Sequence, residues 1–140
     1  MSVFTPEEIE YMRSQRLGRL ATVNAAGAPH IAPVGFRYNP DLDTIDIGGL
    51  DVSATRKYRD VQRDGRVAFV IDDVLPPWKP RGIEIRGNAE AMDQGGKDIN
   101  PNFGDALIRI TPTRVIAWGL SDEPRRTNAR NVNTQGSAGG

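Results

Sequence analysis

The sequence predicts a small, mostly antiparallel barrel of six strands with two short helices. Three observations lead to this prediction. The chain has 140 residues, of which 38% are apolar and 26% charged, as expected for one globular domain with a real core. Short apolar segments recur along it and are separated by turns that contain Gly, Pro or Asn. Two further segments carry the end signals of helices.

The first helix is predicted by residues 5–8, Thr-Pro-Glu-Glu. Thr can cap the helix, Pro suits the first helical position, and the second Glu completes a capping box. This helix should reach residue 15 or 16. Ser53 is expected to open the second helix, which stops at residues 64–65, Asp-Gly, a good C-terminal signal.

The strands follow from apolar segments between turns, and the first three form a meander. An apolar fourth strand is expected to be covered on both faces, and residues 74–80, with three prolines, should not form a regular ladder. Residues 94–105 form a loop, residues 1–120 make up the barrel domain and residues 121–140 a polar tail. The expected strands are 17–23, 29–38, 44–47, 67–71, 82–91 and a last strand over 106–111 and 114–118 with a break near Pro112.

The composition excludes several function classes. Lys and Arg total 18, as do Asp and Glu, so the net charge of zero offers no basic field for nucleic acid. Cysteine is absent and His30 is the only histidine, which argues against disulfides, thiolate chemistry and a metal site. No apolar run approaches the roughly 18–20 residues that span a bilayer. The acidic start is unlike a signal peptide, so we expect a cytoplasmic protein that does not bind membranes.

The strongest candidate binding segment is 48–57, where a strand end and a glycine pair lead into a helix start. Backbone N–H groups at a helix N-terminus favour an anion. Ser53 and Thr55 can add hydroxyl donors, while Arg56 adds a guanidinium fork and Lys57 a mobile charge. The segment therefore predicts a phosphate cradle. The alternative is a capped surface helix with solvated basic residues.

Three other features could line a ligand site. Segment 29–36 carries two prolines, so part of its backbone is free to contact a ligand, and Gly35 admits a flat group. An irregular edge strand is the alternative. Trp78, which lies among prolines, could stack on an aromatic ligand, anchor an interface or fill the core. Trp118, near the end of the last strand, is more typical of a core residue.

No side chain is predicted to be catalytic. His30 has no identifiable partner, and the adjacent Asp72 and Asp73 point to opposite faces of a strand, so they cannot act as a carboxylate pair. Redox or transfer chemistry would therefore come from a bound cofactor. The tail also carries a small cationic cluster, consisting of Arg125, Arg126 and Arg130.

Several segments together resemble the split β-barrel flavin and deazaflavin proteins, which include pyridoxamine 5′-phosphate oxidases; over about residues 5–126 the chain is most similar to the actinobacterial branch that uses coenzyme F420. The resemblance implies a six-stranded antiparallel split β-barrel with short flanking helices, the FMN-binding split barrel. It also implies a homodimer with two equivalent cofactor sites at the interface. The matching segments are 17–22, 27–30, 33–36, 55–57, 81–90 and 110–119.

The resemblance also assigns roles at the cofactor site. The phosphate would be held by Ser53, Thr55, Arg56 and Lys57. The tricyclic ring would be lined by Ala32, Pro33, Val34, Ile47 and Gly48. Trp78, or else Trp118, would close the site from the second subunit. Residues 122–130 lack the histidine of the Arg-Leu-His element that handles substrate in pyridoxamine phosphate oxidases, which argues against vitamin B6 oxidation.

The activity that follows is F420-dependent hydride transfer to an electron-poor double bond of a small molecule, with no metal and no assigned catalytic residue. Unpaired cations at Arg13, Arg16, Arg125 and Arg126 are candidates to receive the acidic tail of F420. An FMN-dependent reductase on the same scaffold is one alternative. The other is a non-catalytic protein that binds F420, FMN or haem, with His30 as the haem ligand.

Overall fold

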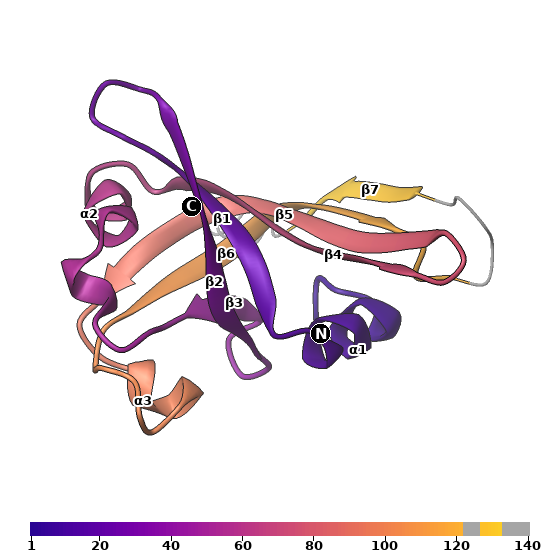
Figure 1. Ribbon diagram of the computed structural model, residues 1–140, viewed down its shortest axis with the longest axis horizontal. Coiled ribbons are helices and arrows are strands. Elements are labelled where there is room, and N and C mark those ends of the chain that lie inside the picture. Colours follow the sequence, from indigo (N-terminus) through magenta and orange to yellow (C-terminus); the bar gives the residue numbers. More distant parts are fainter. Residues whose placement is uncertain (122–126, 133–140) are drawn as a thin grey trace.

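The computed structural model describes residues 1–121 and 127–132. These residues form seven strands, three short α-helices and one 3-10 turn (Figure 1). The helices are α1 (Pro6–Ser14), α2 (Arg56–Arg63) and α3 (Gly96–Ile99), and Val52–Ala54 is the 3-10 turn. The strands are β1 (Leu17–Val23), β2 (Pro29–Asn39), β3 (Thr44–Ile47), β4 (Arg66–Leu75), β5 (Lys79–Met92), β6 (Leu107–Trp118) and β7 (Thr127–Asn131).

Six strands close into an antiparallel barrel, which confirms the predicted fold class. The sheet order is β3-β2-β1-β4-β5-β6, and an additional pairing of β3 with β6 joins the two edges. The seventh strand, β7, pairs with β6 on the outside of the barrel. Figure 1 shows α1 beneath the β4–β5 hairpin, with α2 and α3 at the opposite end of the molecule.

The barrel interior is filled by alternate residues of its strands, as a half-covered antiparallel sheet requires. In β5, Ile83 and Ile85 are fully buried and Ala89 nearly so. The fourth strand also alternates: its inward side chains are buried, whereas its outward ones are only half-buried, so the prediction of cover on both faces was wrong for the isolated chain. The other fully buried core side chains include Met12, Leu20, Ile45, Ile47, Phe69, Ile71, Ile108, Ile110 and Val115.

The closing seam between β3 and β6 is only three residue pairs long. At its centre Asp46 lies opposite Arg109, and the guanidinium donates two hydrogen bonds of 3.0 Å to the carboxylate. Asn39 and Thr44 donate to the same carboxylate at 2.9 Å, so the buried charge of Asp46 is fully compensated. This ion pair is the polar clasp of the barrel.

The N-terminal prediction is confirmed and the second helix begins later than expected. Thr5 caps α1, and the reciprocal capping box with Glu8 is present. Ser53 does not open α2; it lies in the 3-10 turn, and Thr55 is the N-cap, with its hydroxyl accepting from the N–H of Tyr58. Threonine and serine both suit a cap, so composition alone could not choose between two sites separated by one residue.

Two other irregular segments are more regular than predicted. Residues 74–80 continue the β4–β5 ladder, because Val74 pairs with Pro80 and Leu75 with Lys79. Only the Pro76-Pro77-Trp78 turn interrupts it, so the prolines occupy a turn and the edge of a hairpin. The break near Pro112 is a register irregularity opposite Gly87 within one continuous β6.

The loop 94–105 contains α3, and part of the expected tail forms a strand. Residues 127–131 form β7, which pairs with residues 114–118 of β6, so this part of the expected tail belongs to the sheet. Residues 122–126 and 133–140 lie outside the described part. No helix in the described part of the chain is long and apolar enough to span a membrane.

Candidate functional site

Half of β2 has an unpaired edge. β1 pairs with residues 29–35 of β2, whereas β3 pairs only with residues 36–39, because β3 ends at Ile47. Within the described residues no strand lies against the other edge of 29–35. The backbone groups on that edge are therefore available to a ligand. This open edge of the barrel, here called the split, includes Ala32, Pro33 and Val34.

The loop that follows β3 is held in place by the α3 segment. The N–H of Gly104 donates to the carbonyl of Gly49 at 3.0 Å. A Cβ atom at Gly104 would come within 2.8 Å of the Leu50 carbonyl, and one at Gly48 within 2.8 Å of the Phe103 ring. Both glycines are therefore needed for this close approach. The supported loop presents Leu50 to solvent, with 78% of its surface exposed.

The hydroxyl groups of the predicted phosphate cradle are already engaged. Thr55 donates to the carbonyl of Val52 at 2.5 Å while it caps α2. Ser53 donates to the carboxylate of Asp51 at 3.3 Å, a weak bond that an incoming anion could replace. The sequence prediction did not include Asp51, whose negative charge at this place opposes an anion.

The cationic donors of the cradle remain available. The first N–H groups of a helix have no intrahelical acceptor, and in α2 these include Arg56 and Lys57. Among the described residues neither side chain forms an ion pair, and the Lys57 side chain is half-buried. Burial lowers the pKa of the Lys57 ammonium below its ordinary value, because the charged form loses water. A phosphate would supply the missing counter-charge.

Two predicted ring-lining residues face the barrel interior. Ile47 is fully buried and Val34 is 5% exposed, so the two side chains belong to the core and any ligand contact would come from their backbones. Ala32 and Gly48 are half-buried and Pro33 is exposed, which leaves them accessible. The groups exposed at the split are therefore mainly backbone N–H and C=O groups and not a row of side chains.

The two tryptophans lie away from this edge. Trp78 occupies the β4–β5 turn and is 75% exposed; Figure 1 shows that turn at the end of the molecule opposite α2. Trp118 pairs with Gly82, and a Cβ atom at Gly82 would come 2.4 Å from its ring. Trp118 thus covers the base of the same hairpin. Neither residue contacts the cradle of its own chain.

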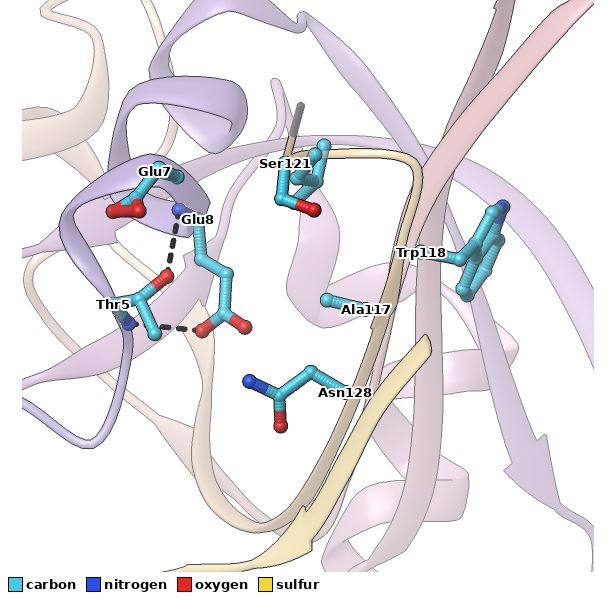
Figure 2. Close-up of a pocket in the computed structure, with 8 residues that line it drawn as sticks. Thr5, Glu7, Glu8, Ala117, Trp118, Ser121 and Asn128 are labelled. Carbon is cyan, nitrogen blue, oxygen red and sulfur yellow. Dashed lines mark hydrogen bonds between the residues drawn. The ribbon is translucent and has the colours of Figure 1, made fainter. Parts of the chain in front are cut away.

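A cavity of about 240 Å³ lies between the start of α1 and the end of β6 (Figure 2). Glu8 and Asn128 both line it, and Figure 2 shows the Trp118 ring pointing away from both. Arg130 donates to Glu8 at 2.6 and 2.9 Å, so it is engaged within its own chain and not part of a free cationic cluster. The sequence did not predict this ion pair, because the only signal at Glu8 was its position in the capping box.

The remaining candidate residues, His30 and the arginines proposed for the cofactor tail, do not lie together in one site. The Nδ1 atom of His30 is buried without a hydrogen-bond partner, and no metal-binding group occurs among the described residues. Arg13 lies 5.8 Å from the centre of the Tyr38 ring, and Arg16 is exposed. Arg125 and Arg126 lie outside the described residues. A second, polar cavity surrounds the barrel clasp and is lined by Arg37, Asn39, Asp41, Asp46, Gly95, Asp98 and Arg109.

Comparison with known proteins places the chain in a family. Residues 4–119 match the model of the pyridoxamine 5′-phosphate oxidase family. A 5a,11a-dehydrotetracycline/5a,11a-dehydrooxytetracycline reductase from Streptomyces rimosus is 42% identical over 135 residues, which cover 94% of this chain and 95% of that protein. The chain therefore belongs to the pyridoxamine 5′-phosphate oxidase family, and these findings support an oxidoreductase built on a split barrel.

Solved structures share the fold. A conserved hypothetical protein from Mycobacterium tuberculosis has a TM-score of 0.68 at 20% identity, and the match covers 85% of this chain and 87% of that one. An FAD-binding protein from Mycobacterium smegmatis has a TM-score of 0.61 at 19% identity, covering 82% and 93%. At these identities the likeness concerns the fold alone.

Proposed function

We propose that this protein is an F420-dependent reductase that transfers a hydride to a conjugated, electron-poor double bond of a planar polycyclic substrate. The observation that carries the proposal is the near full-length match to a dehydrotetracycline reductase at 42% identity. The match covers both chains almost completely. It supports the same reaction type, and it supports a substrate that is also flat and multicyclic.

The residues at the split suit a cofactor with a phosphate and a flat ring. Arg56, Lys57 and the start of α2 provide positive groups for the phosphate. The unpaired edge of β2 provides backbone donors and acceptors for the polar rim of a ring system. Reduced F420 would supply the hydride. FMN offers the same two features, so the cradle by itself supports both cofactors.

The chain's own contribution to the reaction is binding and orientation. The Gly49–Gly104 bond fixes the loop that leads to the cradle, and this sets the distance between phosphate and ring sites. The exposed side chain of Leu50 offers an apolar contact that excludes water. Solvent would deliver the proton, so no dedicated side chain is needed for this step. The sequence accordingly predicts no catalytic residue.

A second copy of the chain is part of the proposal. The outward face of β1 and β2 carries Leu17 and Ile31, which are 56% and 64% exposed, together with Ala21 and Pro33, and its one charged member, Arg19, is paired with Asp72. Exposed apolar side chains on one continuous sheet face are typical of a surface that another molecule covers. In each chain Trp78 lies too far from that chain's own cofactor site to contact it. In a homodimer the partner subunit's Trp78 would close the site instead.

Titration of the purified protein with F420, and separately with FMN, tests the cofactor assignment. Quenching of tryptophan emission reports binding. Lys57→Ala removes the cradle cation, and Arg114→Ala removes a half-buried cation from the distant β6–β7 pair as the matched control. We expect micromolar or tighter binding of F420 that is weakened only by Lys57→Ala. Tight binding of FMN without binding of F420 would mean that the cofactor is FMN.

Turnover then separates an enzyme from a carrier. The oxidation of reduced cofactor is followed by absorbance with and without a dehydrotetracycline. Faster oxidation in the presence of substrate is the expected result. Tight cofactor binding without acceleration by this substrate or by other conjugated polycyclic acceptors would make the protein a cofactor-binding protein.

A further inference from the structure

Three side chains meet where the β4–β5 hairpin leaves the barrel. Asp73 and Arg81 face each other across the ladder, and the guanidinium donates two hydrogen bonds, of 2.7 and 3.0 Å, to the carboxylate. Tyr11 of α1 donates its hydroxyl to the same carboxylate at 2.9 Å. The guanidinium carbon lies 4.9 Å from the centre of the Tyr11 ring. One carboxylate therefore joins α1 to both strands of the hairpin.

Beyond this junction the described residues give the hairpin little tertiary support. Only the pairs Val74–Pro80 and Leu75–Lys79 and the turn follow it. In the described part of the chain, residues 74–80 form no side-chain hydrogen bond, and their apolar members Val74, Leu75 and Trp78 are exposed. An isolated two-stranded ribbon is only marginally rigid in water. The direction of the tip therefore depends on the last anchored residues.

The junction is built to stay in one state. Tyr11 is 4% exposed, and the Arg81 guanidinium keeps the pKa of Asp73 below its ordinary value. Burial, followed by the bond to Asp73, raises the pKa of Tyr11, so its hydroxyl remains a donor at physiological pH. Donor and acceptor roles are fixed, and three bonds converge on one anion.

We infer that Tyr11, Asp73 and Arg81 are positioning residues, which hold the β4–β5 hairpin at the angle that carries Trp78 into the partner subunit's cofactor site. The positioning role stands on the contacts above, while its effect on turnover rests on the proposed function. The positioning role predicts that α1 of one subunit, although remote from the cradle of its own chain, affects substrate binding in the partner subunit.

Fluorescence tests the positioning without any cofactor. In a Trp118→Phe background Trp78 is the single tryptophan, and its time-resolved anisotropy reports how freely the hairpin tip moves. Tyr11→Phe removes one hydrogen bond and keeps the ring; Asp73→Asn removes the charge. Asp64→Asn is the matched control, since Asp64 forms a similar two-armed pair with Arg66 at the far end of β4. We expect faster local motion of Trp78 in the two junction variants only.

Kinetics in the otherwise unchanged protein then test the consequence. Loss of a hydrogen bond to a charged group corresponds to about a tenfold effect, so we expect KM for the substrate to rise about tenfold with a smaller change in kcat. Trp78→Ala should show the same pattern. Circular dichroism and the thermal midpoint verify that each variant is folded, and Arg81→Lys, which keeps the charge without the fork, should give an intermediate result.

The two parts of the inference fail differently. Unchanged anisotropy of Trp78 in folded Tyr11→Phe and Asp73→Asn would overturn the positioning role. Altered anisotropy with unaltered KM, in these variants and in Trp78→Ala, would support the positioning role and remove Trp78 from the proposed site.

Discussion

Arg130 in β7 donates hydrogen bonds to both carboxylate oxygens of Glu8 in α1, at 2.9 and 2.6 Å, and thereby joins the two ends of the described chain. The Glu8 side chain is 3% exposed, and the same carboxylate accepts from the N–H of Thr5. One residue thus completes a helix cap and anchors the strand outside the barrel. Together with the Tyr11–Asp73 bond, it fixes α1 on two sides.

Arg130→Ala should destabilise the protein by about 3 kcal/mol, because it removes the cation that compensates the buried Glu8 carboxylate. Urea unfolding measures the change. Arg114→Ala, which removes an exposed bond to Asn131 in the same strand pair, should cost less than about 1 kcal/mol. Equal effects of the two substitutions would show that β7 pairing, and not the buried ion pair, is what matters.

Arg109→Ala should lower stability by about 3 kcal/mol or more, since Asp46 at the barrel seam would keep a buried charge without its cation. The measurement is again urea unfolding. Glu90→Gln serves as control because Glu90 lies opposite Arg109 on β5 but is exposed. A small effect of Arg109→Ala would mean that Asn39 and Thr44 alone compensate the carboxylate.

Acid should weaken the α1–hairpin junction. Arg81 is the largest cause that lowers the pKa of Asp73, burial opposes it, and Tyr11 adds to the lowering. A carboxyl with a lowered folded-state pKa contributes stability above its ordinary value of 3.8, and that stability is lost as the pH falls through the folded-state pKa. Stability measured between pH 6 and about pH 2 should therefore fall less steeply in Asp73→Asn than in the parent. Parallel curves would contradict this.

Cofactor affinity should fall in alkaline solution. The pKa of Lys57 lies below its ordinary value of 10.5 because of burial, and a bound phosphate would raise it. Affinity is then constant near neutrality and decreases as the pH rises through the pKa of the free protein. Titrations between pH 7 and pH 10 measure it, and Lys57→Ala should show a flatter profile. A decrease that survives in Lys57→Ala would assign the effect to another group.

Ile31→Glu should dissociate the proposed dimer, weakening association by about a hundredfold through a charge on the apolar sheet face. Sedimentation velocity provides the measurement. Leu42→Glu is the matched control: Leu42 is 54% exposed but lies in the β2–β3 turn, not on the sheet face. A parent protein that is monomeric at concentrations where it binds cofactor tightly would contradict the shared site.

Local patterns in the sequence determined most of the secondary structure. The capping box at residues 5–8, the strand at 17–23 and the strand at 44–47 each depend on neighbours within a few residues, and each is found as expected. The family resemblance, carried by segments spread over the chain, correctly indicated the split barrel. It also pointed to the segment around Lys57, whose side chain is half-buried and forms no ion pair with any described residue.

Tertiary structure decided what depends on partners distant in sequence. Nothing near Asp46 or Glu8 reveals that each would face an arginine from a strand far along the chain, because such pairs exist only after the chain has folded. The unpaired edge of β2 likewise arises from the length of β3, a different element. Periodicity tells which side of a strand is apolar; the closed sheet alone determines which charges meet and which edge is left open for a ligand.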